Sequence, residues 1–286
     1  MASFPRTMVG GVSLSRLIIG TNWLLGYSHC TPAKDKYIKE VIRERKAIAD
    51  ILEVFFRAGV DTIMAPFDNA PLHDALKDAQ DRTGVKGILI STPSLPVTAA
   101  TPSQGFDIGE VERILDATAA QGAVFCMPHQ CTTDALTDRC SREVRRMADI
   151  IPLIRQRGMI PGLSTHMPEA IVYADETKLD VETYISIYNS AGFLMQLEVD
   201  WVAKLIQQAQ HPVMTIKPLA AGQLRPFQGL NFVWNTIRPC DMVTIGTMSP
   251  DEAREVIDMS LGILAHQPAD IKLQETRSKA SVKAVG

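Results

Sequence analysis

The sequence lacks the features of several large classes of protein. No segment approaches the roughly 20 consecutive apolar residues that span a bilayer, and the opening MASFPRTMVGGVSLSRL holds no apolar run long enough for a signal peptide. The 29 Lys and Arg nearly balance the 32 Asp and Glu, and no basic stripe is present to hold a phosphate backbone. We therefore expect no membrane, secretory or nucleic-acid role.

Cysteines are few and irregularly spaced. The chain has five, an odd number, and no pair has the C-x-x-C spacing that holds zinc or an iron–sulfur cluster. A reducing compartment suits such a chain, and we expect a cytoplasmic protein.

What the chain does contain is a regular alternation of short apolar runs and longer amphipathic stretches. Of its 286 residues 46% are hydrophobic, enough for one large core, and the alternation is typical of parallel β/α units. We predict one (β/α)₈ TIM barrel over residues 1–286, with a flexible tail from about residue 274. The eight predicted strands are Leu17–Gly20, Thr62–Ala65, Gly87–Ser91, Ala123–Met127, Gly162–Ser164, Thr183–Tyr188, Val213–Ile216 and Met242–Ile245.

Helical periodicity and loop composition complete this outline. Apolar residues at helical spacing predict outer helices over Ala47–Arg57 and Asp251–Leu264. The segment GYSHCTPAKDKY reads as a long first loop that folds over the barrel mouth. The later segment LAAGQLRPFQGLNF is too broken for a long helix and is expected over the same mouth.

Five segments spread over the chain resemble the aldo-keto reductases. They are LSRLIIGTNW, GLSTHMPEA, DVETYISIYN, TIKPLAAGQL and VTIGTMSPDEARE. The family reads roughly G-x-S-N-(F/Y)-(S/T)-P-E at the fifth strand, Y-N at the end of the sixth and S-P-L-(A/G)-G-G after the seventh. The resemblance implies a (β/α)₈ barrel, bound NADP, and a catalytic tetrad of Asp, Tyr, Lys and His.

Most of that tetrad is not retained. Alignment with the family places Met64 at the position of the Asp, Asn69 at that of the proton-donating Tyr, and Pro93 near that of the Lys. Only His129 matches. The general acid of a reductase is therefore missing.

The expected cofactor contacts are also altered. Ser164 is retained, but Thr165 replaces an Asn and Ile185 falls where a Gln is expected to hold the nicotinamide amide. NADP is thus disfavoured. A phosphate or other anion could still bind at the start of the last helix, at Gly246, Thr247, Ser249 and Arg254.

The candidate site residues are the polar side chains that follow the strands, because a barrel of this kind carries its chemistry at the C-terminal mouth. As catalytic residues we predict His129, Lys217, Asp68 and Tyr188. As substrate-binding residues we predict Asn22, Tyr27, His29, Asn69, His166 and Asn189.

Several of these residues have open roles. His129 could be a general base, a metal ligand or a structural histidine, and Asp68 either a catalytic carboxylate or a helix cap. Lys217 precedes a proline, which favours an extended backbone that points the amine inward. That amine could form a Schiff base, act as a base, or neutralise an anion.

A divalent metal is a further alternative. It would require at least three of Asp68, His73, His129, His166 and Glu198 to converge, although neither HxH nor HExxH occurs.

Taken together, these residues favour a non-redox enzyme of the lyase or isomerase type that moves protons on a small polar carbonyl or sugar-like substrate. His129 would be the acid/base, Lys217 the electrophile or imine former, and Asp68 and Tyr188 would orient hydroxyls. The alternatives are an NADP-dependent oxidoreductase with a different proton donor, and a non-catalytic barrel that binds a ligand or a protein. Substrate identity and oligomeric state stay open.

Overall fold

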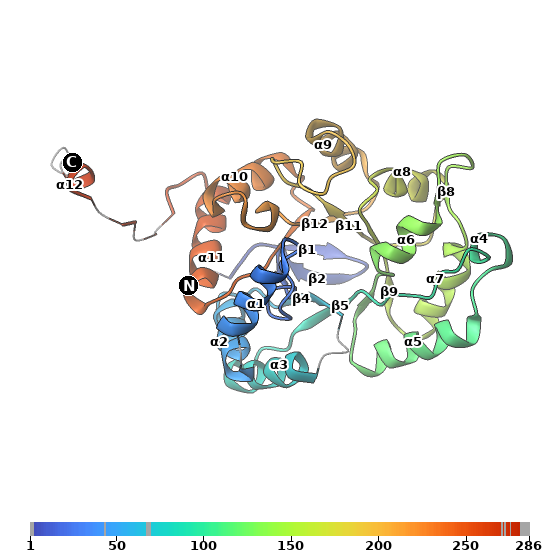
Figure 1. Ribbon diagram of the computed structural model, residues 1–286, viewed down its shortest axis with the longest axis horizontal. Helices are drawn as coiled ribbons and strands as arrows, with labels where there is room; N and C mark the ends of the chain where they lie inside the picture. Colours follow the sequence, from blue (N-terminus) through green and yellow to red (C-terminus); the bar gives the residue numbers. More distant parts are fainter. Residues whose placement is uncertain are drawn as a thin grey trace.

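Parallel strands form the centre of the molecule. The computed structural model describes residues 3–42, 44–66, 70–269, 271, 273–274 and 276–280. One sheet runs in the order β10-β11-β12-β13-β3-β4-β5-β6-β9, and every neighbouring pair is parallel (Figure 1). Its members are β3 (Leu17–Gly20), β4 (Thr62–Ala65), β5 (Ile88–Ser91), β6 (Phe125–Cys126), β9 (Ile160–Pro161), β10 (Leu163–Thr165), β11 (Tyr184–Ile187), β12 (Val213–Ile216) and β13 (Met242–Ile245).

Gly162 closes this sheet into a barrel. It alone separates β9, which pairs with β6, from β10, which pairs with β11, so the two segments act as one strand with a neighbour on each side. A Cβ atom at Gly162 would lie 2.7 Å from Met127 Cε and 2.7 Å from the Thr183 carbonyl oxygen. Only glycine therefore fits where the strand changes partner, and eight strands complete the ring.

Alternation along the strands separates two apolar layers. Inward-facing side chains such as Ile18, Phe125 and Met242 fill the barrel, and outward-facing ones pack beneath the helices. The helices are α1 (Pro32–Val41), α2 (Arg45–Arg57), α3 (Ala70–Thr83), α4 (Thr101–Gln104), α5 (Ile108–Ala120), α6 (Gln130–Leu136), α7 (Met147–Gln156), α8 (Glu169–Glu176), α9 (Val199–Gln208), η1 (Ala220–Gly222), α10 (Pro226–Thr236), α11 (Pro250–Leu264) and α12 (Arg277–Ala280).

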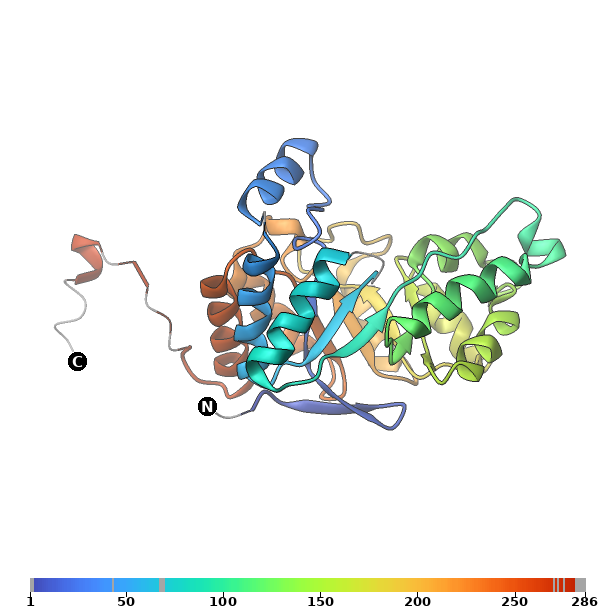
Figure 2. The ribbon, with the colours of Figure 1, turned by 90° about the horizontal axis from the view of Figure 1, so that it is seen from below.

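Two small hairpins complete the sheet structure. Strands β1 (Arg6–Val9) and β2 (Val12–Ser15) turn at Gly10 and Gly11, whose φ values are +52° and +81°. In Figure 2 this hairpin and α1 lie at opposite ends of the barrel, and Val9 and Leu14 of the hairpin join the inner apolar cluster. The second hairpin joins β7 (Thr137–Asp138) to β8 (Glu143–Val144).

The predicted strands are confirmed within a few residues, and four of the eight have the predicted bounds. Two segments predicted as loops contain helices. The first loop contains α1, whose N-cap Thr31 accepts a hydrogen bond from Lys34 N, and the broken seventh segment contains most of α10, which begins at Pro226. Among the described helices, none is long and apolar enough to cross a bilayer.

Candidate active site

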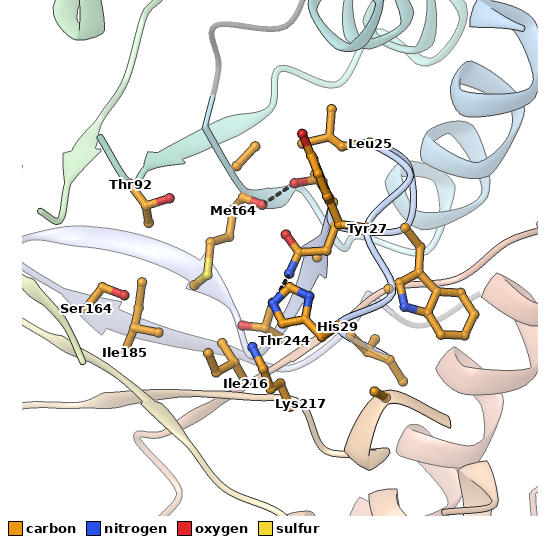
Figure 3. A pocket seen from close by; sticks show the side chains of 18 of the residues that line it. Leu25, Tyr27, His29, Met64, Thr92, Ser164, Ile185, Ile216, Lys217 and Thr244 are labelled. Atoms are coloured by element: carbon orange, nitrogen blue, oxygen red, sulfur yellow. Dashed lines mark hydrogen bonds between the residues drawn. The ribbon is translucent and has the colours of Figure 1, made fainter. Parts of the chain in front are cut away.

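A cavity of about 520 Å³ opens at the C-terminal ends of the barrel strands. Residues that follow β3, β4, β5, β6, β10, β12 and β13 contribute to its wall, and the first loop from Asn22 to His29 covers part of it (Figure 3). Active sites of (β/α)₈ enzymes occupy this end of the barrel.

The deeper wall of the cavity is apolar. Met64, Ile185 and Ile216 line it and pack with the inner core. The polar residues Thr92, Ser164 and Thr244 interrupt this apolar wall. Such a lining suits a small molecule with an apolar part and a few polar groups.

Lys217 is the one lysine or arginine among the described residues that line the cavity. Burial lowers the pKa of its amine to about 8. Its φ is +60°, so the predicted extended backbone was wrong: Lys217 begins a turn in which Ala220 N donates to the Lys217 carbonyl. The side chain nevertheless points into the cavity, as Figure 3 shows.

The turn after Lys217 is held in a strained backbone. Ala220 and Ala221 also have positive φ values, of +49° and +55°. A Cβ atom at Gly229 of α10 would lie 2.5 Å from the Pro218 carbonyl oxygen, so the helix packs directly on this turn. Close packing compensates the unfavourable backbone and fixes Lys217 in place.

Three histidines share the cavity with Lys217. Burial lowers the pKa of His29, His129 and His166, and the positive charge of Lys217 lowers each pKa further. For His166 the pKa falls to about 4. The rings are therefore kept neutral, and each has one nitrogen that can donate and one that can accept a proton.

His129 has a defined tautomer. It is the N-cap of α6, and its Nδ1 accepts from Cys131 N at 3.4 Å. The proton of the neutral ring is then on Nε2. His29 differs, because its Nε2 lies 3.5 Å from the Asn22 amide nitrogen, which can only donate.

The cavity carries no negative charge on the residues that the structure describes. None of its described lining residues is acidic. The charge of Asp35 raises the pKa of His29 in part; Asp35 accepts hydrogen bonds from the Ser28 backbone N and hydroxyl and so anchors the first loop. Asp68 and Asn69, predicted as site residues, lie outside the described residues.

The other predicted site residues divide into two groups. Asn22, Tyr27, His29, His129, His166 and Lys217 all line the cavity. Tyr188 does not: it is buried in the outer layer, where its hydroxyl donates to Thr236 and its ring packs on Phe232. Asn189 is also buried and closes a turn with Phe193 through two hydrogen bonds.

The predicted anion site is already filled by the chain itself. Ser249 is the N-cap of α11 and accepts from Glu252 N, while the Glu252 carboxylate accepts from Met248 N. These contacts place a negative charge at the start of α11, where a phosphate would bind. Gly246 lines the cavity, Thr247 is buried outside its lining, and Arg254 pairs with Asp251 at the surface.

No metal site is assembled within the described ranges. No group of three or more His, Cys, Asp or Glu side chains there is placed to hold an ion. Neither His73 nor Glu198 lines the cavity.

Asp134 is a site-supporting residue that the sequence did not reveal. It accepts hydrogen bonds from the Thr165 hydroxyl and from His166 N, and so holds the turn after β10 that carries His166. Thr165, aligned with a nicotinamide-binding Asn, is thereby turned away from the cavity. Position 134 lies in a helix far from residue 165 in sequence, and no motif marks it.

Solved structures match this architecture. A Pseudomonas aeruginosa protein assigned to the aldo-keto reductases is 17% identical over 89% of this chain and 93% of that chain, with a TM-score of 0.61. The glycerol dehydrogenase of Gluconobacter oxydans is 12% identical over 94% and 99%, with a TM-score of 0.56. A chain of the BexX/CysO complex of Amycolatopsis orientalis is 12% identical over 96% and 100%, with a TM-score of 0.55.

Sequence comparison adds no closer assignment. No protein-family model matches the chain, and no curated protein matches it in sequence. At the identities of the solved structures the likeness concerns the fold alone. The predicted aldo-keto reductase-like (β/α)₈ barrel is thereby confirmed.

Proposed function

We propose that this barrel is a non-redox enzyme that moves protons on a small carbonyl compound, with Lys217 as the group that activates the carbonyl. The observation that carries this proposal is the Lys217 amine inside a cavity shared with three histidines and no described acid. A cavity that held a lysine only for charge neutralisation within the protein would offer it a carboxylate partner.

The state of Lys217 suits covalent chemistry. With a pKa of about 8, about one tenth of the amine is neutral at pH 7, far more than for an exposed lysine. A neutral amine is a nucleophile toward a carbonyl carbon.

The steps balance without an oxidant or a reductant. A neutral histidine takes one proton from the Lys217 ammonium group, and the free amine attacks the carbonyl carbon. One nitrogen-bound proton then passes to the oxygen, the histidine returns its proton to the same oxygen, and a water molecule leaves to give a protonated imine. The imine draws electrons from the adjacent C–H bond, whose proton passes to a neutral histidine and whose electron pair forms an enamine. Return of a proton and hydrolysis of the imine release the product and restore the amine.

Two of the histidines can take distinct roles in these steps. His129, with its proton on Nε2, can donate a hydrogen bond to the carbonyl oxygen and so polarise the carbonyl group. His29 lies beside Lys217 in Figure 3, and its Nε2, which faces the Asn22 amide nitrogen at 3.5 Å, carries the lone pair that would take the proton from carbon in place of that contact.

The exchange of a carbon-bound proton with solvent can be measured, and this measurement tests the proposed function directly. In D₂O, NMR would follow hydrogen exchange next to the carbonyl of pyruvate, dihydroxyacetone and glyceraldehyde. We expect the wild type to accelerate exchange for at least one compound, Lys217→Met to abolish the acceleration, and His129→Gln to reduce it by about 10²–10⁴-fold.

A matched control is available on the surface. Lys204 of α9 is exposed and stacks on Trp201, so Lys204→Met should exchange at the wild-type rate. Wild-type exchange by Lys217→Met would contradict the proposed role. Oxidation of NADPH during turnover of any of the three compounds would contradict the non-redox assignment.

A further inference from the structure

The charge of the cavity restricts its substrate. Lys217 is its one cationic lysine or arginine among the described lining residues, and the three rings beside it are held neutral. A protonated Lys217, or the protonated imine formed from it, leaves one positive charge without a described counter-charge. One negative charge on the substrate would balance it.

A second observation locates a partner for that negative charge. The Thr244 side chain lines the cavity and is 6% exposed. Its Oγ1 is itself enclosed and has no hydrogen-bond partner among the described residues. A buried hydroxyl left unpaired is unfavourable by about 1–3 kcal/mol until an acceptor reaches it.

Strand register places this hydroxyl beside Lys217. Thr215 of β12 pairs with Val243 of β13, so Thr244 lies level with Ile216, one residue before Lys217. Met242 faces the barrel interior, and alternation turns Thr244 the same way. Figure 3 shows both side chains at the same wall of the cavity.

The remaining contacts favour a carboxylate over a phosphate. A phosphate carries up to two charges, against the single lysine present, and the helix N-terminus that could have held it is filled by the Glu252 carboxylate. The apolar wall of Met64, Ile185 and Ile216 would accept a hydrocarbon group on the far side of the carbonyl.

We propose that the substrate is a 2-oxo acid, with its carboxylate on Thr244 and its keto carbon at Lys217 Nζ. This inference rests on the proposed function and names its substrate class. The Thr244 hydroxyl donates to the carboxylate, and the neighbouring carbon then lies within reach of the amine.

Reductive trapping tests the inference with defined probes. Borohydride delivers hydride to the imine carbon and converts it to a stable secondary amine on lysine. Purified protein would be treated with borohydride and pyruvate, its neutral ester methyl pyruvate, or dihydroxyacetone phosphate, and labelled Lys217 quantified by peptide mass spectrometry. Trapping on free Nα-acetyllysine corrects for the intrinsic reactivity of each probe.

After this correction, we expect pyruvate to label Lys217 about tenfold or more faster than methyl pyruvate does. This ratio corresponds to the free energy of one hydrogen bond to a charged group. Thr244→Val should remove most of this preference. Ser186→Ala, which deletes another buried hydroxyl without a described partner but outside the cavity lining, should keep it.

The possible results of this trapping experiment distinguish failure of the carboxylate site from failure of the proposed function. Equal trapping by pyruvate and methyl pyruvate would overturn the carboxylate site and leave the reactive lysine intact. Preferred trapping by dihydroxyacetone phosphate would show that the cavity binds a phosphate group and would overturn the proposed carboxylate. Absence of trapping on Lys217 with all three probes, while Nα-acetyllysine reacts, would overturn the proposed function itself.

Discussion

At the scale of single residues, Lys217 combines an unfavourable backbone with an unfavourable environment for its charge. Its φ is +60°, and burial lowers the pKa of its amine from 10.5 in an unfolded chain to about 8. Groups that lower the stability of the folded state in this way are typical of functional sites.

Replacing Lys217 should therefore stabilise the protein. The unfolded chain holds the lysine proton more tightly than the folded one, so the destabilisation is complete below pH 8 and disappears between pH 8 and 10.5. Lys217→Met should raise the free energy of unfolding at pH 7 by about 1–3 kcal/mol, and by less at pH 10. Urea unfolding at the two pH values measures this; a gain that does not shrink with pH would contradict it.

At the scale of secondary-structure elements, the site depends on contacts between segments that carry no motif. Asp134 of α6 holds the turn after β10, and burial raises the pKa of its carboxyl group although Thr165 and His166 donate to it. The hydrogen bonds thus stabilise a carboxylate in an otherwise unfavourable place.

Removing the Asp134 carboxylate should loosen the turn. Asp134→Ala leaves the Thr165 hydroxyl and His166 N without their acceptor, and we expect a loss of about 2–4 kcal/mol in unfolding free energy. Asp134→Asn keeps one acceptor oxygen and should lose less. Wild-type stability of Asp134→Ala in urea unfolding would contradict the role of these hydrogen bonds.

Element positions were predictable where a periodic pattern existed. Strands such as Thr62–Ala65 and Val213–Ile216 were found because Val, Ile and Met cluster there between polar stretches. The β1–β2 hairpin was missed although Gly10-Gly11 between alternating residues is a known turn signal. The α10 helix was missed because its Pro and Gly, counted as breakers, serve as its start and as a point of close packing.

At the scale of the whole molecule, the β1–β2 hairpin and the proposed site occupy opposite ends of the barrel. The hairpin with Val9 and Leu14 seals the N-terminal end, and Lys217 with the histidines lies at the C-terminal end. The sequence predicted this division, since eight β/α units imply a barrel with its site at one mouth. It did not predict that Tyr188 lies in the outer layer or that Asn189 closes a turn with Phe193, because strand ends do not reveal the last residue's direction.

Closure of the ring should be sensitive to a single carbon atom. Gly162→Ala places a Cβ against Met127 Cε and the Thr183 carbonyl, and we expect a loss of about 2–4 kcal/mol in unfolding free energy. In Gly109→Ala the nearest atom is 3.5 Å away in a helix, so stability should be unchanged or higher. Similar stability of the two variants would contradict the closure described for Gly162.

The hairpin should affect stability without affecting chemistry. Leu14 is fully buried in the inner cluster, and Leu14→Ala should lower the unfolding free energy by about 2–5 kcal/mol. Met8 on the same hairpin is 60% exposed, and Met8→Ala should change it by less than about 0.5 kcal/mol. Both should keep the wild-type dependence of Lys217 trapping on pH; a shifted dependence in Leu14→Ala would show that the two ends are coupled.

Lys217 is a buried, weakly basic amine at the centre of the proposed site, and its own titration tests this most directly. Protein labelled with ¹³C at the lysine ε-carbon would be titrated by NMR, with the Lys217 signal assigned by its absence in Lys217→Met. We predict a midpoint at about pH 8. A midpoint near 10.5, the ordinary value for lysine, would show a solvated ammonium group and contradict the account of the site.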